Sequence, residues 1–230
     1  MHLLAVETSG VHGGIALLDG ADTAALVEEV HLEEGLRHAR DMLVAIKGAC
    51  ERAGWQPRGI DAVAVSIGPG SFTGLRIAVT LAKFVAWDTG ATIAAVPSLR
   101  ALAENAPADC ERMACILDAK RGGLYASVFE RRDDGLDETF GPALIQPDDL
   151  ARRLDRPAFI LGRGIPKAAE ALAAFDLAPE TLWDVRPATV ARLGYAMCER
   201  GEFADPLRLE PVYVRRPEAE EIWQRRHGPV

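Results

Sequence analysis

The stretch most informative for chemistry joins a valine-rich segment to a segment of helical pattern. It reads Ser66-Ile67-Gly68-Pro69-Gly70-Ser71-Phe72-Thr73-Gly74-Leu75-Arg76. Its two first glycines allow a sharp turn, and Ser71 is placed to cap the following helix. Free backbone N–H groups at such a turn can bind an anion, although the Gly-Lys-Ser/Thr of a Walker loop does not follow. Two interpretations therefore remain open. The stretch could bind an anion, or it could be only a tight, well-capped turn between a strand and a helix.

The histidines and cysteines form no pattern typical of a metal site or a nucleophile. Metal ligation needs converging donors, and no two of the five histidines stand four residues apart. The four cysteines include no Cys-x-x-Cys pair, and Ser71 lacks the Gly-x-Ser-x-Gly pattern because Pro69 stands two residues before it. We therefore expect no resident metal and no catalytic residue. The positions are His2, His12, His31, His38, His227, Cys50, Cys110, Cys115 and Cys198.

Composition excludes several classes of protein. The chain has 230 residues, 49% of them hydrophobic and 26% charged, which is typical of a globular protein. A net charge of −8 makes it a poor candidate for holding a nucleic-acid backbone alone. The first apolar run meets Glu7 too early for a signal peptide, and the run Leu75–Trp87 carries Arg76 and Lys83. We expect a protein of the reducing cytoplasm.

The first half of the chain predicts the order β-β-β-α-β-α-β-α. Turn pairs such as Ser9-Gly10 and Asp19-Gly20 separate three short apolar segments, and apolar residues three and four apart then mark a helix. We expect Ser98 to cap the last helix. The expected elements are strands Leu3–Glu7, Gly14–Leu18 and Thr23–Val30, helix Leu36–Ala53, strand Asp61–Ile67, helix Phe72–Trp87, strand Thr92–Val96 and helix Ser98–Asn105.

The second half predicts a similar order, which divides the chain into units 1–106 and 107–230. We expect the last helix or the C-terminal arm to be able to pack back on the first unit, and the tail from Glu210 to be extended and partly mobile. The expected elements are strands Met113–Asp118, Gly123–Glu130 and Glu138–Ile145, helix Pro147–Leu154, strand Ala158–Leu161, helix Pro166–Phe175, strand Thr181–Val185 and helix Ala188–Arg200.

This order predicts an α/β fold with two similar units, each with a mixed sheet, and a cleft between them. The first three strands of a unit pair antiparallel through tight turns, and later strands run parallel because helices cross over. The actin, sugar kinase and heat-shock ATPase superfamily, which is RNase H-like, shares this architecture. A fold analogy alone carries no function.

Four motifs together resemble the TsaB (YeaZ) family over nearly the whole chain. They are Leu4–Ser9, Gly68–Arg76, Leu117–Tyr125 and Glu210–Arg215. Three positions depart from the family's usual pattern: Ala39 replaces a hydroxyl residue after His38, Val44 replaces a helix proline, and Glu7 replaces the commoner Asp. The first departure puts a role for a hydroxyl beside His38 in doubt.

The resemblance implies a non-catalytic dimerisation subunit of the bacterial complex that makes threonylcarbamoyladenosine in tRNA. Such a chain would bind the catalytic sister subunit TsaD and act together with the small ATPase TsaE. It would meet tRNA only within the complex, and it could form a homodimer when isolated. It would have no cofactor of its own: the complex would use ATP-derived threonylcarbamoyl-adenylate and a metal held by the sister subunit.

The resemblance and the fold analogy also suggest two groups of site residues. The first unit would carry the partner surface on its helices Leu36–Ala53 and Phe72–Trp87. A vestigial nucleotide cleft would contain Glu7, Thr8, Ser9, Gly68, Gly70, Ser71, Asp118, Gly162 and Gly164. The partner interface would contain Leu36, His38, Leu43, Leu75, Arg76, Ala78, Val79, Ala82, Val85 and Ala86.

The helix Phe72–Trp87 has an apolar arc of roughly 220°, wider than packing on one core needs. We expect its bulky row, Ile77, Leu81 and Phe84, to face the unit's own sheet. The row of small residues would then let a second helix approach closely, either Leu36–Ala53 of this chain or its counterpart in a partner subunit. The alternative is that both units of this one chain cover the helix.

Two other functions stay open. The chain could be a nucleotide-binding enzyme of the same superfamily, in which Glu7, Asp118 and the Gly68–Ser71 turn would still be functional. It could also be a glycoprotease-like peptidase, although the absent histidine pair and the absent nucleophile pattern argue against that.

Overall fold

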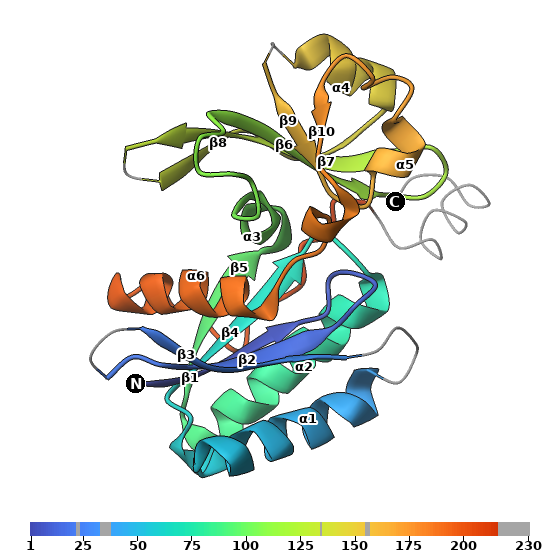
Figure 1. Cartoon of the computed structure of the whole chain (residues 1–230). Coiled ribbons are helices and arrows are strands. Elements are labelled where there is room, and N and C mark those ends of the chain that lie inside the picture. Colours follow the sequence, from blue (N-terminus) through green and yellow to red (C-terminus); the bar gives the residue numbers. More distant parts are fainter. Residues whose placement is uncertain (22–23, 33–37, 134, 155–156, 216–230) are drawn as a thin grey trace, which may run out of the picture.

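A computed structural model describes residues 1–21, 24–32, 38–133, 135–154 and 157–215. The described residues form two five-stranded sheets, one above the other in Figure 1, with helices around and between them. This confirms the predicted α/β fold class with two units, each with a mixed sheet. Within the described residues, no helix is both long and apolar enough to cross a membrane.

The first sheet has the strand order β3-β2-β1-β4-β5. The hairpin strands pair antiparallel, and β4 and β5 join them in parallel, as the helical crossovers require. Residues alternate between the two faces, so that Leu4 and Val6 lie in one core cluster while Leu3 and Ala5 lie in the other. The strands are β1 (His2–Glu7), β2 (Gly14–Asp19), β3 (Ala25–His31), β4 (Ala62–Gly68) and β5 (Thr92–Pro97).

Helices cover both faces of this sheet. On the lower face in Figure 1 lie α1 (His38–Ala53) and α2 (Phe72–Thr89), which pack on the cluster that includes Leu4 and Val6. On the upper face lie α3 (Ser98–Ala103) and α6 (Pro187–Glu199). The core on this side continues into the second unit. A short 3-10 turn, η1 (Pro57–Gly59), precedes β4.

The second sheet has the strand order β10-β9-β6-β7-β8. Its central strand β6 pairs antiparallel with β7 and parallel with β9, which repeats the mixed pattern of the first sheet. The elements are β6 (Arg112–Asp118), β7 (Leu124–Arg132), β8 (Gly135–Ile145), α4 (Pro147–Arg153), β9 (Phe159–Leu161), α5 (Ile165–Ala168), β10 (Asp176–Leu177) and η2 (Glu180–Leu182).

Two predicted elements of the second unit are wrong. The expected helix Pro166–Phe175 is helical only through Ala168 and then continues as turns. The expected strand Thr181–Val185 is a 3-10 turn followed by a bend, and the edge strand is instead the two-residue β10. Such short elements depend on the neighbouring strand rather than on their own periodicity.

The last helix, α6, follows the second unit in sequence but packs on the first sheet. Glu29 of β3 accepts a hydrogen bond from the Ala188 backbone N–H at 2.9 Å and pairs with Arg186 at 3.1 Å. A Cβ at Gly194 would stand 2.2 Å from the Ala64 Cβ, so the helix lies very close to the sheet. Helix α6 therefore links the second unit to the first.

Residues 203–215, here called the C-terminal strap, run back along the first unit. The Ala204 N–H donates to Ile93 O at 2.8 Å, and Leu209 is buried in the α1/α2 core. The strap ends on the second unit, where the Arg215 guanidinium donates to Ala119 O at 3.1 Å. Residues 210–215 of the expected arm contain no helix or strand and contact both units, and residues 216–230 lie outside the described part of the chain.

Candidate functional site

The glycine-rich turn between β4 and α2 has the predicted cap. The Ser71 hydroxyl accepts the Gly74 N–H at 3.2 Å, and Ser71 O accepts the Leu75 N–H at 2.8 Å. Gly68 has φ of 110°, a region that side-chain-bearing residues rarely adopt. The turn is thus built as the local sequence predicts.

The end of β1 fills the space against this turn. The Ser71 N–H, which an anion would need, donates to Ser9 O at 2.7 Å, and the Thr8 hydroxyl donates to Gly74 O at 2.6 Å. A Cβ at Gly70 would stand 2.3 Å from Ser9 O, and one at Gly74 would stand 1.9 Å from Thr8 O. These glycines are required by the close approach of another backbone, not by an anion.

Two further elements close the same turn. The Gly68 N–H donates to the Ser98 hydroxyl at 3.0 Å, so Ser98 holds the turn instead of capping α3 as expected. The strap contributes Val212, whose N–H donates to Ile67 O at 2.7 Å. The turn is therefore a junction of β1, α3 and the strap, which fixes where α2 begins.

Glu7 is enclosed in this junction with an exposed fraction of 1%. Its Oε1 accepts the Ser9 N–H at 2.5 Å and the Ser9 hydroxyl at 2.6 Å. Burial raises the pKa of the Glu7 carboxyl, and the hydroxyls of Ser66 and Ser9 with nearby backbone N–H groups only partly offset this. Oε2 has no hydrogen-bond partner of good geometry among the described residues.

Asp118, at the end of β6, lies in a different environment. Its carboxylate pairs with Lys167 at 3.0 Å and with Lys120 at 3.3 Å, and it accepts the Lys120 N–H at 2.7 Å. Burial would raise the pKa of Asp118, but the hydrogen bonds from both lysines outweigh it and lower the pKa. Two ammonium groups thus neutralise the Asp118 carboxylate.

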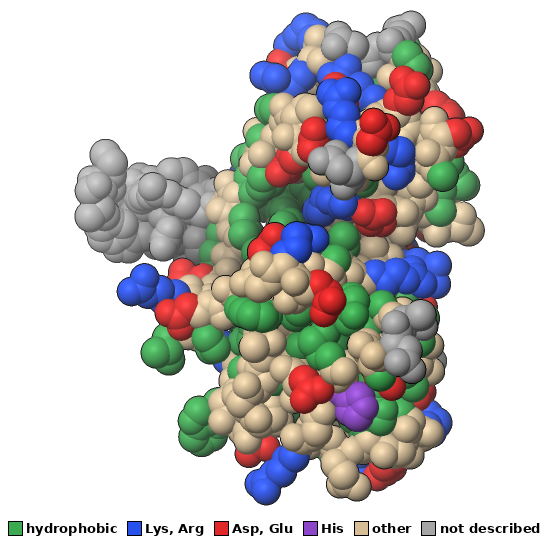
Figure 2. All heavy atoms as spheres, turned by 90° about the vertical axis from the view of Figure 1, so that its left-hand side faces the viewer, with side chains coloured by type: hydrophobic (Ala, Val, Ile, Leu, Met, Phe, Trp, Pro, Cys, Tyr) green, Lys and Arg blue, Asp and Glu red, His purple; other side chains and the backbone are tan. Residues whose placement is uncertain are grey.

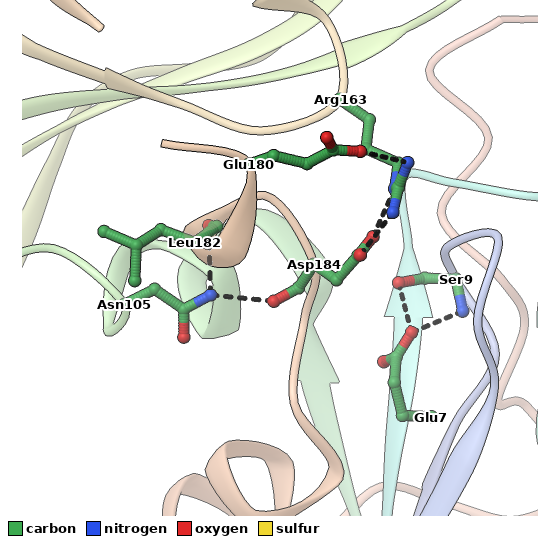
Figure 3. Close-up of polar contacts among 7 residues, drawn as sticks. All are labelled: Glu7, Ser9, Asn105, Arg163, Glu180, Leu182 and Asp184. Carbon is green, nitrogen blue, oxygen red and sulfur yellow. Dashed lines mark hydrogen bonds and ion pairs between the residues drawn. The ribbon is translucent and has the colours of Figure 1, made fainter. Parts of the chain in front are cut away.

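The expected nucleotide turn, Gly162–Gly164, packs on β6. A Cβ at Gly162 would stand 2.2 Å from Ile116 O, and the Gly164 N–H donates to the same oxygen at 3.0 Å. Between these glycines, the Arg163 guanidinium binds both carboxylate oxygens of Asp184, at 2.5 and 2.6 Å. Figure 3 shows this pair lying over the turn that holds Glu7 and Ser9.

The predicted cleft residues therefore form two groups. Glu7, Thr8 and Ser9 meet the Gly68–Gly74 turn, whereas Asp118, Gly162 and Gly164 gather at the end of β6. The Arg163–Asp184 pair, which sequence reasoning missed, stands between the groups, and Asn105 fixes it by donating to Asp184 O at 2.7 Å. Among the described residues, no three His, Cys, Asp or Glu side chains converge on one point as metal ligands.

The predicted partner face of α2 is wrong in its orientation. The small residues Ala78 and Ala82 are fully buried against the chain's own sheet, as are most of their neighbours. Small side chains allow the helix to approach the sheet closely. Five predicted interface residues are therefore part of the first unit's core: Leu75, Ala78, Val79, Ala82 and Ala86.

The large apolar side chains exposed on the two helices are different ones. On α1, Leu43 is 56% and Val44 is 67% exposed; on α2, Phe84 is 57% and Trp87 is 84% exposed. Of the remaining predicted interface residues, Arg76 is exposed and Val85 is half-buried. Leu36 lies outside the described residues, and so does the His38 side chain. Trp87 belongs to neither predicted row of the helix, and its exposure is the feature that sequence reasoning missed.

Comparison with known proteins assigns the family. The chain is 30% identical to the TsaB protein of tRNA threonylcarbamoyladenosine biosynthesis from Bacillus subtilis, over 97% of this chain and 98% of that protein. The chain belongs to the TsaB (YeaZ) family. The TsaB protein of Escherichia coli is 26% identical over 68% of this chain and 67% of its own length. The family takes part in tRNA threonylcarbamoyladenosine biosynthesis.

Two further comparisons agree. Residues 33–177 match the model of the family "TsaD: tRNA N6-adenosine threonylcarbamoyltransferase", so TsaB and TsaD proteins are related in sequence. The structure of YeaZ from Pseudomonas aeruginosa has the same fold, with a TM-score of 0.78, 23% identity and coverage of 92% of this chain and 99% of that one. Two departures from the usual TsaB pattern can now be located: Val44 is an exposed apolar residue of α1, and Glu7 is buried.

Proposed function

We propose that this chain is a non-catalytic subunit that binds a TsaD-family subunit and thereby supports threonylcarbamoyl transfer to tRNA. The sister subunit would hold the metal and the ATP-derived threonylcarbamoyl-adenylate, and a TsaE-type ATPase would complete the complex. The acceptor would be the adenosine next to the anticodon. The isolated chain could use the same surface to form a homodimer.

The observation that carries this proposal is the exposure of four large apolar side chains on α1 and α2: Leu43, Val44, Phe84 and Trp87, here called the apolar face. Single exposed apolar residues are ordinary, but several large aromatic and aliphatic side chains exposed on two contacting helices are typical of protein interfaces. Because the matched TsaD model begins before α1 and extends past α2, a partner with the same helix pair could offer a similar face.

The candidate cleft supports a role without chemistry of its own. Backbone and hydroxyl groups of the chain occupy the glycine turn, lysines neutralise Asp118, and Arg163 binds Asp184. These groups, which a nucleotide or metal ion could otherwise use, thus have internal partners, and Glu7 is buried. The face in Figure 2 carries acidic and basic side chains in mixture, which favours tRNA contact through the assembled complex rather than through this chain alone.

The test is co-purification with the TsaD-family subunit of the same organism, followed by a tRNA modification assay with each chain alone and with both. We expect Trp87→Ser to weaken the complex and lower modification in parallel, because it removes the most exposed aromatic of the face. Leu144→Ser is the matched control: this leucine is 44% exposed but lies on β8 of the second unit. Modification by the chain alone, or equal binding by both variants, would refute the proposal.

A further inference from the structure

The outer side of α2 carries an aromatic and guanidinium group built from two distant parts of the chain. The Arg76 guanidinium lies 3.8 Å from the centre of the Phe72 ring, and its Nε donates to the Tyr213 hydroxyl at 3.1 Å. The two rings are 5.1 Å apart. Phe72 is 39% and Tyr213 is 38% exposed, and Arg76 is exposed as well. We call these three residues the Arg76 platform.

The strap holds Tyr213 in place. One residue earlier, the Val212 N–H donates to Ile67 O at 2.7 Å, and Leu209 is buried with an exposed fraction of 7%. Two residues later, Arg215 donates to Ala119 O on the second unit. Tyr213 is therefore fixed on both sides, and Arg76 is ordered between two rings before any ligand arrives.

Arg76 still has binding capacity. Its Nη1 and Nη2 atoms have no hydrogen-bond partner within the described ranges, whereas a guanidinium offers a planar pair of donors to a carboxylate. The one acid of α2, Asp88, pairs with Arg58 at 3.8 Å. The platform thus has a positive charge that nothing on its own helix neutralises.

Trp87 of the apolar face lies on the same side of α2 as the platform. At 100° per residue, Phe72, Arg76 and Trp87 fall within about 60° of one another around the helix. All three are exposed. Aromatic residues and arginine at the ends of one exposed helix face are the composition that interface centres favour.

We propose that the strap completes the partner-binding face, and that Arg76 receives a carboxylate of the TsaD-family partner. This rests on the proposed function, because it uses the same partner and the same face of α2. The apolar neighbours and the chain's net charge of −8 favour a protein carboxylate over an RNA phosphate. Because the guanidinium is already held by Phe72 and Tyr213, binding loses little side-chain entropy.

The experiment measures affinity for the TsaD-family subunit by calorimetry at two salt concentrations. We expect Arg76→Gln to weaken binding by about tenfold to a hundredfold and to reduce its salt dependence, because a buried charge pair is lost. Tyr213→Ala should weaken binding about as much, and Tyr213→Phe, which keeps the ring, by only a few fold. Arg208→Gln is the control, since Arg208 is an exposed strap residue whose side chain is 89% exposed.

The outcomes separate this inference from the proposed function. If Trp87→Ser loses the complex while Arg76→Gln or Tyr213→Ala binds as wild type, the proposed function stands and the platform is not part of the interface. If all variants bind as wild type, both ideas fail. If Arg76→Gln keeps its affinity for the TsaD-family subunit but weakens tRNA binding by the assembled complex, the platform binds an RNA phosphate and the inference is overturned. Thermal melts of every variant confirm that each is folded.

Discussion

The central strand of each sheet ends in a carboxylate, but the two units treat that carboxylate in opposite ways. In the first unit, β1 ends at Glu7, which is buried among hydroxyls and backbone groups without an opposite charge in its hydrogen bonds. In the second unit, β6 ends at Asp118, which stays partly exposed between two lysines. At the same topological position, the turn of the first unit is therefore filled by packed groups, whereas the carboxylate of the second unit is neutralised by ion pairs.

The difference indicates where each unit's stability lies. A turn closed by packing tolerates no added volume, because backbone atoms cannot move aside. A turn closed by exposed ion pairs tolerates substitution, because water replaces the lost partner. The first unit, whose turn sets the start of α2 and hence the partner face, has the less tolerant closure.

The largest effect is expected at Gly74. Alanine usually stabilises a helix relative to glycine, but here its Cβ would stand 1.9 Å from Thr8 O. We expect Gly74→Ala to lower the free energy of unfolding by about 2–3 kcal/mol. Chemical denaturation measures this change.

The matched control is Gly48→Ala in α1, where the added Cβ meets only the flexible end of Arg52. It should leave stability unchanged or raise it by up to about 1 kcal/mol. Equal behaviour of the two variants would show that the β1 turn can move away from α2. The same close approach applies at Gly70, which has no positive φ but whose Cβ would stand 2.3 Å from Ser9 O.

The next effect concerns the ion pair between the two groups. Asp184 and Arg163 have side chains 29% and 28% exposed, so their pairing is only partly screened by water. We expect Asp184→Asn to lower the free energy of unfolding by about 1–2 kcal/mol. Glu51→Gln, which breaks an exposed pair with Lys47 on α1, should change it by less than about 0.5 kcal/mol. Similar melts for the two variants would mean that the Arg163–Asp184 pair contributes no more to stability than an exposed ion pair.

The two carboxylates should also give opposite responses to pH. Glu7 has a raised pKa, so it keeps its proton longer in the folded state, and its contribution to stability is lost as pH rises above 4.5 toward the folded pKa. Asp118 has a lowered pKa, so its contribution is present above 3.8 and is lost as pH falls below that value.

Thermal melts between pH 3 and pH 9 of Glu7→Gln and Asp118→Asn measure both effects. Relative to wild type, Glu7→Gln should become more stable as pH rises, and Asp118→Asn should lose its disadvantage in acid. Parallel curves for the wild type and either variant would show that the carboxylate in question has the same pKa in both states.

Much of the first unit could be predicted from sequence because its elements are long and periodic. The order of β1 to α3 follows from apolar spacing and turn residues, and Ser71 caps α2 as its position indicates. In the second unit, α5 and β10 are four and two residues long, too short for a periodic signal. Their conformation depends on neighbouring strands.

The orientation of α2 could not be predicted for a related reason. A wide apolar arc does not say which half faces the sheet, since bulky and small side chains can both be buried. In the structure, Ala78 and Ala82 allow close packing on the sheet and leave Phe84 and Trp87 outside. The Arg163–Asp184 pair could not be predicted from sequence either, because its two residues are distant in sequence and meet only through tertiary packing.

The smallest effect is expected for the lysines around Asp118, and it tests whether the second turn is a suppressed active site. Lys120 and Lys167 have side chains 81% and 47% exposed, so the double variant Lys120→Ala/Lys167→Ala should lose less than about 1 kcal/mol of stability. It should also hydrolyse no ATP with magnesium, because freeing one carboxylate leaves Glu7 enclosed by Ser9 and the glycine turn filled by β1. Lys47→Ala on α1 serves as the control for the loss of an exposed lysine. ATP hydrolysis that appears in the double variant and disappears when Asp118→Asn is added would contradict this expectation. It would show that the two lysines alone keep Asp118 from acting, and that the second unit is regulated by charge.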